Sequence, residues 1–156
     1  MQSFNTDMLK NCGRVHTMKD VSQSLDDLYK SNWENFSIDL ISSLPHMTMD
    51  IWTDTLKQAI ACNSQHISIY DLQVEENTAF GRWYTPGSFP LPNEEISSNM
   101  YKAAVEMMNQ GGFEHYEVSN YARTSQYRSK HNQKYWKLQP VIGFGMYVIV
   151  SYIAIH

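Results

Sequence analysis

The stretch that decides the fold is FSIDLISSLPHMTMDIWTDTLKQAIACNSQHISIYDL, which covers residues 36–72. Its first part, residues 36–41, alternates and then turns apolar, a pattern typical of a β-strand. Thr48 precedes apolar residues that recur at helical spacing, so it is the expected N-cap of a helix. Residues 66–72 form the next predicted strand. A strand, a helix and a strand in this order predict a right-handed βαβ unit with parallel strands.

The same alternation extends to both sides of this unit. Thr17 is the expected N-cap of a helix that ends near residues 31–32. Further along the chain, Asn93 is expected to cap a helix over residues 94–109 that Gly111 and Gly112 terminate. Residues 115–119 alternate as a further strand. Helices that alternate with strands predict an α/β fold class.

Residues 82–92, with three prolines and one glycine, interrupt this pattern and predict a long loop. The last third of the chain is predicted to be irregular, including the sequence KHNQKYW at residues 130–136. The apolar tail, residues 141–155, is shorter than the roughly 20 residues of a membrane span, and its glycines favour a strand and a turn. We therefore expect no membrane span, and the N-terminus shows no signal peptide.

Charge and composition exclude some classes of function. The net charge of −4 and the hydrophobic content of 42% are ordinary for one soluble globular domain. Nucleic acid is not expected as the main partner, because no basic stripe is available to neutralise phosphates. A solvated loop accounts for the one basic cluster, which consists of Arg123, Arg128, Lys130 and Lys134.

The two cysteines, Cys12 and Cys62, lie fifty positions apart and form neither a CxxC pair nor a disulfide framework. A reducing compartment is therefore the default. Each cysteine is predicted to be a small buried hydrophobic residue rather than a ligand, and we predict no metal site in this chain.

Polar residues within or just after strands are the first candidates for a site. Asp39 lies in a predicted parallel strand, where both faces are buried, so it must be paired or must face a ligand at the carboxyl end of the strand. Alternatively it caps the turn at residues 42–45, and both interpretations stay open. Gln73 and Glu75 follow the next strand, and Glu117 lies in a later one. Together they predict a site at one face of a barrel.

A histidine among aromatic residues is the second candidate. His131 and Asn132 lie beside Tyr135 and Trp136, and a histidine in such a place can ligate a metal, including haem iron. The alternative is a turn whose aromatic residues pack as an anchor. The other histidines show no metal-ligand spacing; they are His16, His46, His66 and His115.

Several blocks of the sequence, in order, resemble the second half of the radical-SAM core in oxygen-independent coproporphyrinogen III oxidases and their haem-chaperone relatives. They are QSF (2–4), CGRVHT (12–17), SIDLISSLPHMT (37–48), HISIYDLQVEENTAFG (66–81), HYEVSNYA (115–122), KHNQKYW (130–136) and GFG (143–145). The resemblance implies a partial TIM-like (β/α) barrel over residues 1–92. It also implies a truncated post-barrel α+β extension over residues 93–156.

The resemblance also implies residues that bind S-adenosyl-L-methionine (SAM). The family's contacts fall on Gln2, Arg14, Asp39 and Gln73, and a last contact falls on Ile149. Carboxylate, amide and guanidinium groups can hold the sulfonium and amino acid moiety of SAM by charge-assisted hydrogen bonds. Asp39 thereby becomes a predicted site residue.

The HNxxYW block and the segment from Tyr70 to Glu75 are more similar to the haem-chaperone branch than to the oxidases. This similarity implies haem binding, with His131 as the haem contact, and delivery of haem to haem-accepting proteins. In the oxidase branch the corresponding activity would be porphyrinogen decarboxylation.

The family's cluster motif, CxxxCxxC, is absent from this chain, although full-length members use both SAM and a [4Fe–4S] cluster. Three thiolates must converge on such a cluster, so we expect that this chain cannot bind it and is inactive alone. The chain is expected to begin in the middle of the barrel and to leave the edge of the strand at residues 36–41 unpaired. An alternative function is a non-catalytic β/α interaction module. The expected compartment is the cytoplasm, or a plastid or mitochondrion if a transit segment lies upstream.

Overall fold

The computed structural model describes residues 2–141, so the apolar tail, the GFG block and Ile149 lie outside the described residues. The elements in chain order are α1 (Thr6–Asn11), α2 (Met18–Lys30), β1 (Ser37–Ser42), α3 (Met49–Ala61), β2 (His66–Asp71), α4 (Ala79–Trp83), α5 (Glu94–Gln110), β3 (Glu114–Glu117), β4 (Asn120–Ala122), a 3-10 turn (Ser125–Tyr127) and α6 (Lys130–Trp136).

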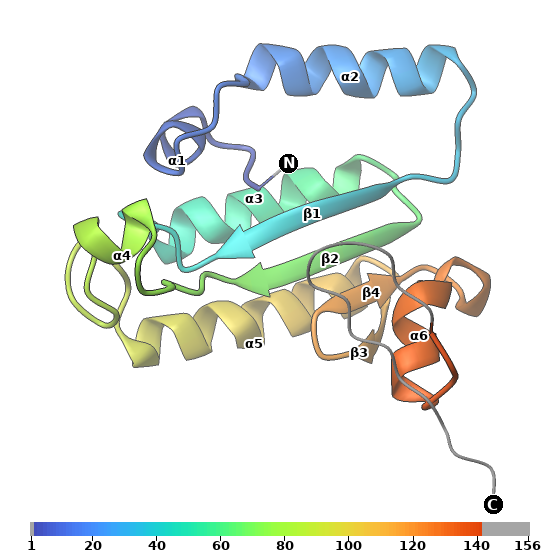
Figure 1. Ribbon diagram of the computed structural model, residues 1–156. Helices are drawn as coiled ribbons and strands as arrows, with labels where there is room; N and C mark the ends of the chain where they lie inside the picture. Colours follow the sequence, from blue (N-terminus) through green and yellow to red (C-terminus); the bar gives the residue numbers. More distant parts are fainter. Residues whose placement is uncertain (1, 142–156) are drawn as a thin grey trace, which may run out of the picture.

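One four-stranded sheet in the order β1-β2-β4-β3 organises the molecule (Figure 1). β1 and β2 are parallel, in a register that runs from Ser37 opposite His66 to Ser42 opposite Asp71. With α3 between them they form the predicted βαβ unit, which confirms that prediction. β4 is antiparallel to both β2 and β3, so the sheet is mixed and β1 is an edge strand among the described residues.

The core lies between the sheet and the helices α3 and α5. Ile38 and Leu40 of β1 and Ile67 of β2 are buried on this side. Trp52 of α3 is fully buried, and its indole Nε1 donates to the backbone carbonyl of Met100 in α5 at 2.8 Å. This bond joins the two helices through the core, so both helices are tied to the same sheet face.

The predicted helix caps are confirmed. The Thr48 hydroxyl accepts from the Ile51 N–H at 3.3 Å, and the Asn93 side chain accepts from the Ile96 N–H at 2.9 Å. At the start of α2, the Asp20 carboxylate accepts from the Thr17 N–H at 2.7 Å, as in a capping box.

The predicted glycine terminator of α5 is confirmed as well. Gly112 adopts a φ of +79°, in the left-handed region that glycine enters without a steric penalty. Gly111 is close to α3, because a Cβ on it would lie 3.0 Å from side-chain atoms of Ile60. The pair therefore ends α5 and lets the two helices approach.

The predicted strand over residues 115–119 is wrong in its extent. The structure has a tight hairpin there, in which β3 turns at residues 118–119 into β4. Glu117 accepts from the Ser119 N–H at 3.3 Å, so a local side-chain bond fixes the turn. A period-two pattern cannot show this, because the alternation continues through the turn.

The prediction of an irregular KHNQKYW segment is also wrong, because these residues form α6. Ser129 is the N-cap, and its hydroxyl accepts from the Asn132 N–H at 3.2 Å. The helix is short and has no buried residue, so the apolar periodicity that identifies longer helices is missing.

A solvated loop does not account for the basic cluster, because Arg123 is half-buried. Its guanidinium donates to the carbonyls of Ser64 at 3.0 Å, Gly111 at 3.3 Å and Ile60 at 3.5 Å, and it lies 4.4 Å from the centre of the Phe113 ring. Arg123 thus joins the C-terminal ends of α3 and α5, where helix carbonyls attract a positive charge.

Elements from both sides of the predicted boundary at residues 92/93 share this sheet, since β4 is bonded to β2. The division into a barrel part and an extension therefore stays a prediction about the full-length protein. Within residues 2–141, no helix has the length and apolar character that a membrane span requires.

Candidate functional site

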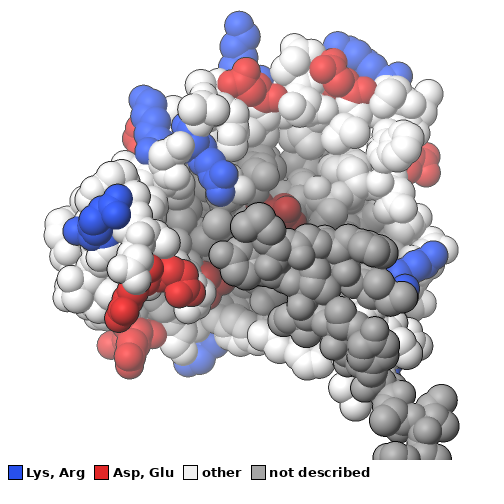
Figure 2. Space-filling model, in the orientation of Figure 1, with Lys and Arg blue, Asp and Glu red and all other residues white. Residues whose placement is uncertain are grey.

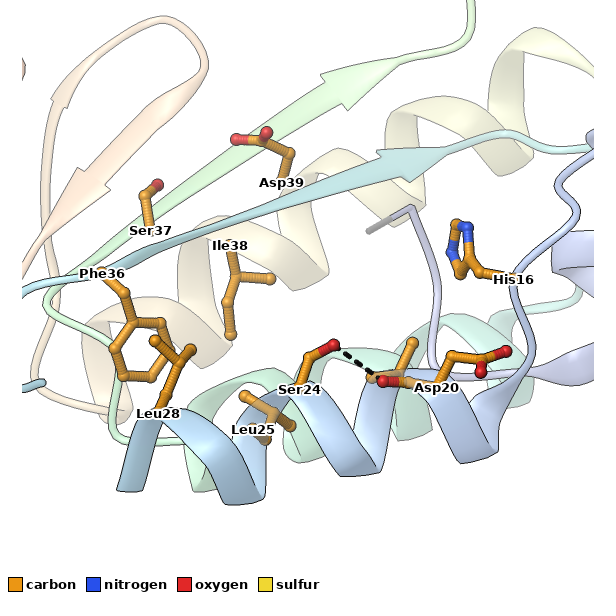
Figure 3. Close-up of a pocket in the computed structure, with 10 residues that line it drawn as sticks. His16, Asp20, Ser24, Leu25, Leu28, Phe36, Ser37, Ile38 and Asp39 are labelled. Atoms are coloured by element: carbon orange, nitrogen blue, oxygen red, sulfur yellow. Dashed lines mark hydrogen bonds between the residues drawn. The ribbon is translucent and has the colours of Figure 1, made fainter. Parts of the chain in front are cut away.

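One face of the sheet is not covered by α3 and α5. We call it the open face, and it consists of Ser37, Asp39, His66, Ser68, Tyr70 and Asn120, which alternate with the core residues of their strands. Figure 3 shows Ser37 and Asp39 on one side of β1, and Ile38 on the other side, toward α2. Ser37, Asp39 and Tyr70 of this face are exposed, whereas His66, Ser68 and Asn120 are buried.

Asp39 is exposed on this face and has no hydrogen-bond or ion-pair partner within residues 2–141. The expectation that it must be paired or must face a ligand assumed a strand buried on both faces. That premise is wrong at this position, because the Asp39 side chain is exposed. A carboxylate that is exposed in mid-strand keeps its charge available to a cationic ligand.

Gln2 lies beside Asp39, at the outer edge of β1. Its backbone carbonyl accepts from the Ile41 N–H at 3.0 Å, which fixes it two positions from Asp39 along the strand. Its side-chain Oε1 is buried and finds no partner in the described part of the chain. A buried, unpartnered amide oxygen suits a ligand that brings an N–H donor, such as an amino group.

Arg14 is exposed in the loop that follows α1, and its N–H donates to the Leu9 carbonyl at 3.0 Å. His16, two residues later, is half-buried, and its Nε2 has no partner among the residues described. Only Arg14 of the GRVH block is a predicted site residue. The structure instead places the histidine of that block in a groove.

This groove has a volume of about 330 Å³ and lies between α2 and β1 (Figure 3). His16 and Asp39 line it together, and the rest of its lining is mostly apolar, from Val21, Leu25, Leu28, Phe36 and Ile38. One face of α2 is therefore only partly covered.

Gln73 lies in a second cavity, of about 320 Å³, at the carboxyl ends of β1 and β2. Ser43 and Ser97 also line it, and their hydroxyls are hydrogen-bonded at 3.0 Å. Gln73 is exposed and follows the end of β2, as predicted. Gln2 and Gln73 are thus found next to the ends of the paired strands β1 and β2.

Glu75 and Glu117 do not line this cavity. Glu75 is exposed, and its carbonyl accepts from the Thr78 hydroxyl at 2.7 Å, just before α4. Glu117 ends β3 at the far edge of the sheet. It is paired with Asn120, which is paired with Ser68, so it lies level with the middle of β2 rather than with its carboxyl end.

A hydrogen-bonded chain crosses the open face instead. His66 is buried; its Nδ1 lies 2.9 Å from the Ser37 hydroxyl, and its Nε2 lies 2.8 Å from the Tyr116 hydroxyl. Burial lowers the pKa of His66, although the charges of Asp39 and Glu117 act in the opposite direction. The imidazole is therefore neutral near pH 7 and connects β1 to β3 through β2.

The residues of the KHNQKYW block lie on different sides of α6. His131 and Tyr135 are exposed, and their ring centres are 5.0 Å apart in an edge-to-face arrangement. Trp136 instead donates from Nε1 to the Glu117 carboxylate at 3.0 Å. The KHNQKYW helix thus presents the exposed imidazole of His131 beside the ring of Tyr135. Trp136 of the same helix attaches it to the hairpin.

The cysteines do not form a cluster site. Cys12 caps the C-terminal end of α1, and the neighbouring Asn11 contacts the Pro45 carbonyl, near the start of α3. Cys62 caps the other end of α3, a 13-residue helix about 20 Å long. Burial raises the pKa of both thiols, which opposes the thiolate form that iron requires. Within the described range, no three or more His, Cys, Asp or Glu side chains form a group that could hold a metal ion.

Figure 2 shows one side of the molecule, on which acidic and basic side chains are interleaved around the periphery. They do not gather into a single basic stripe on that view. The exclusion of nucleic acid as the main partner stays a sequence-based prediction.

Comparison with protein-family models finds no match. Among curated proteins, the chain is 41% identical over 146 residues to the haem chaperone HemW of Synechocystis, covering 94% of this chain and 35% of that protein. It is 35% identical to HemW of Bacillus subtilis, which it covers to 38%. It is 32% identical to the mitochondrial radical S-adenosyl methionine domain-containing protein 1 of Danio rerio, which it covers to 32%. The chain therefore spans about a third of the length of these relatives.

The fold has known counterparts among solved structures. The Escherichia coli coproporphyrinogen III oxidase HemN, a radical-SAM enzyme, superposes with a TM-score of 0.71 at 20% identity, over 80% of this chain and 29% of that one. The archaeal Elp3 of Methanocaldococcus infernus superposes with a TM-score of 0.55 at 23% identity. These matches show that the described sheet and helices share the fold of a part of each of these structures. With sequence similarity along nearly the whole chain and a fold that agrees, the chain is similar to HemW-like and HemN-like radical-SAM proteins over about a third of their length.

Proposed function

We propose that this chain provides one side of a SAM pocket and a haem-contacting helix in a haem-chaperone-like radical-SAM protein. The observation that supports it most directly concerns Gln2, which is bonded to β1 at Ile41, and Asp39 of β1. Within the described residues, the side-chain oxygen of Gln2 is buried without a partner, and the Asp39 carboxylate is exposed without one. These groups fit the amino acid moiety and the sulfonium of SAM, which offer N–H donors and positive charge.

Arg14 and Gln73 complete the proposed SAM contacts. Arg14 is exposed after α1, and Gln73 lines the cavity at the ends of β1 and β2. SAM supplies a sulfonium-activated group when it is bound. The role of this chain is to hold the amino acid end of the cofactor and to exclude water from its side of the pocket.

Asp39→Asn tests the SAM assignment, best in a full-length homologue that has the equivalent residue. The substitution keeps the shape and removes the charge, so SAM affinity should fall by about tenfold or more. Asp26→Asn is the matched control, because Asp26 is exposed on α2 and lines neither of the two cavities. Equal SAM affinities for the parent and Asp39→Asn would remove the assignment.

We infer that haem binds at His131, the exposed histidine of α6. Its exposure leaves a ring nitrogen accessible, and the edge-to-face contact with Tyr135 offers a flat neighbour for a macrocycle. Delivery of haem to acceptor proteins is part of the same proposal, which is supported by the similarity to HemW proteins that are named haem chaperones.

Haem titration followed by visible absorption tests this role. His131→Ala should lose the ligand-dependent shift of the main absorption band and bind haem at least about tenfold more weakly. His46→Asn is the control, because His46 is exposed elsewhere and has a φ of +63°, which asparagine tolerates. A spectrum of His131→Ala identical to the parent would contradict the proposal.

The chain is proposed to hold no [4Fe–4S] cluster of its own and to be inactive alone. Reconstitution with iron and sulfide should then give no cluster absorption in this chain. An absorbing, stable cluster would refute this part of the proposal. Coding sequence upstream of Met1 that contains CxxxCxxC in frame would show that the functional protein is longer.

A non-catalytic interaction module is the second candidate. The observation that favours it is the well-packed core around Trp52, which the described residues form among themselves. A monodisperse product of this length in cells, with a sharp thermal transition, would favour this function. The proposed compartment is the cytoplasm, or an organelle as for the relative whose name includes "mitochondrial".

A further inference from the structure

The hairpin of β3 and β4 contains an irregularity beside α6. Glu114 is opposite Ala122 and His115 is opposite Tyr121, but the next pair is Glu117 with Asn120. Tyr116 is therefore the extra residue of a β-bulge. In a regular strand, consecutive side chains point to opposite faces, whereas a bulge re-aims one of them. Here both Tyr116 and Glu117 make contact with α6 or its cap.

Tyr116 holds the N-terminal end of α6. Its hydroxyl accepts from the backbone N–H of Ser129, the N-cap, at 3.0 Å. The same hydroxyl is 2.8 Å from the Nε2 of His66, and His66 is bonded through Nδ1 to Ser37. Ser129, the N-cap of the helix, is thereby connected to Ser37 of β1, two residues from Asp39.

Glu117 holds the C-terminal end of α6. One carboxylate oxygen accepts from the Trp136 indole at 3.0 Å, and the other accepts from the Ser119 N–H and from the Asn120 side-chain amide. Both oxygens are thus occupied, which fixes the carboxylate before the helix contacts it. The indole is exposed to 61%, so packing contributes little to its placement.

The two contacts decide which side of α6 faces solvent. Gln133 and Trp136 line a groove of about 410 Å³ together with Tyr116 and Glu117. His131 is exposed and is not among the residues of that groove. No residue of α6 is buried, so hydrogen bonds rather than core packing place the helix.

We propose that Tyr116 and Glu117, brought to the same side by the β-bulge, are positioning residues that fix α6 and thereby the direction in which His131 faces. The inference rests on the proposed function of His131 as the haem contact. Neither residue touches the ligand; they act through the two ends of the helix.

The test compares Tyr116→Phe and Trp136→Phe in the complete chain, because each leaves an aromatic ring at its position and removes one hydrogen-bonding group. Tyr101→Phe and Trp83→Phe are matched controls: these side chains are exposed to 50% and 65% and have no hydrogen bond in the described structure. Glu117→Gln, alone and with Trp136→Phe, completes a double-mutant cycle.

Hydrogen exchange of the α6 amides is the readout that does not depend on haem. Exchange should be about tenfold faster in Tyr116→Phe and in Trp136→Phe, and unchanged in both controls, while the global unfolding midpoint moves little. When Trp136→Phe is added to Glu117→Gln, the exchange rate of the α6 amides should hardly increase further. Unchanged α6 exchange in both test variants would overturn the proposal.

Haem absorption separates this inference from the proposed function. If the parent spectrum does not change in His131→Ala, the haem assignment fails, and faster α6 exchange would still establish the two contacts. If the parent spectrum depends on His131 and the test variants speed up exchange without changing haem affinity, the positioning role is overturned. A loss of haem affinity of about threefold to tenfold in both variants, but in neither control, is the expected result.

Discussion

The βαβ unit from β1 to β2 and the hairpin–helix unit from β3 to α6 are held together in different ways. The first is held by apolar burial: Ile38, Leu40 and Ile67 lie under Trp52, and few polar side chains take part. In the second, β4 joins the core through Tyr121, but α6 has no buried residue and is held by hydrogen bonds from Tyr116 and Glu117.

This difference teaches where stability and where function belong in the molecule. Apolar burial contributes about 25 cal/mol per Å² and tolerates small changes in side-chain direction. A hydrogen bond contributes about 1 kcal/mol net, but it fixes direction. The βαβ unit thus provides a stable frame, and the hairpin–helix unit provides an oriented surface at low cost in stability.

The largest expected effect is in the frame. Trp52→Ala removes a fully buried indole and leaves the Met100 carbonyl without its donor, so unfolding free energy should fall by about 3–5 kcal/mol. Urea unfolding measures it. Trp83→Ala, at an exposed tryptophan of α4, should change stability by no more than about 0.5 kcal/mol. Equal losses for both would break the contrast.

Arg123 connects the two units, and its loss should have the next largest effect. Arg123→Ala leaves three carbonyls at the ends of α3 and α5 without their donor, for about 2 kcal/mol of unfolding free energy. Arg123→Lys should recover little, because an ammonium lacks the planar fork. Full recovery by lysine would show that charge alone matters. Arg82→Ala, in α4, is the control.

Two helix caps sharpen the comparison. Asn93→Ala removes the cap of α5, a core helix, and should cost about 1 kcal/mol in global unfolding. Ser129→Ala removes the cap of α6 and should leave global unfolding nearly unchanged while α6 amides exchange faster. An equal loss of global stability in both variants would show that α6 unfolds together with the frame.

The smallest expected effect is a pH dependence from His66. Its folded pKa lies below its unfolded value of 6.5 because of burial, despite Asp39 and Glu117 nearby. The unfolded state therefore binds the proton first as pH falls, so stability is complete above about pH 6.5 and decreases below it. Thermal midpoints between pH 7.5 and about 5 measure it. His66→Asn should flatten this part of the profile; an unaltered slope would rule out His66 as its source.

The sequence alone was enough to predict the frame and not the hairpin–helix unit. Thr48, Asn93 and the glycines after α5 are local signals that act within a few residues, and the apolar spacing of β1 and α3 is strong. The bulge at Tyr116 depends on the pairing of two strands, and α6 depends on contacts with that bulge. Neither the bulge nor α6 produces a periodic pattern of apolar residues in the sequence.

The candidate site shows the same limit. Asp39 and Gln73 could be selected from their places in and after strands, and the structure has them on and beside β1 and β2. His16 could not be selected in this way, because its groove lies between α2 and β1. The spacing of residues in the sequence does not show that these two elements lie next to each other. The partners of Glu117 were missed for the same reason, since Trp136 is nineteen residues away.

The bulge at Tyr116 also restricts how this part of the chain can change in evolution. Substitutions at positions 116 and 117 alter one contact each, but the loss or gain of a single residue there shifts the strand pairing. Glu117, the residue of β3 that follows Tyr116, would then point to the opposite face of the sheet. The loop at residues 84–92 lies between α4 and α5 and has no such register. Length variation among descendants of this chain should therefore accumulate in that loop, and the hairpin should keep its length even where its letters drift.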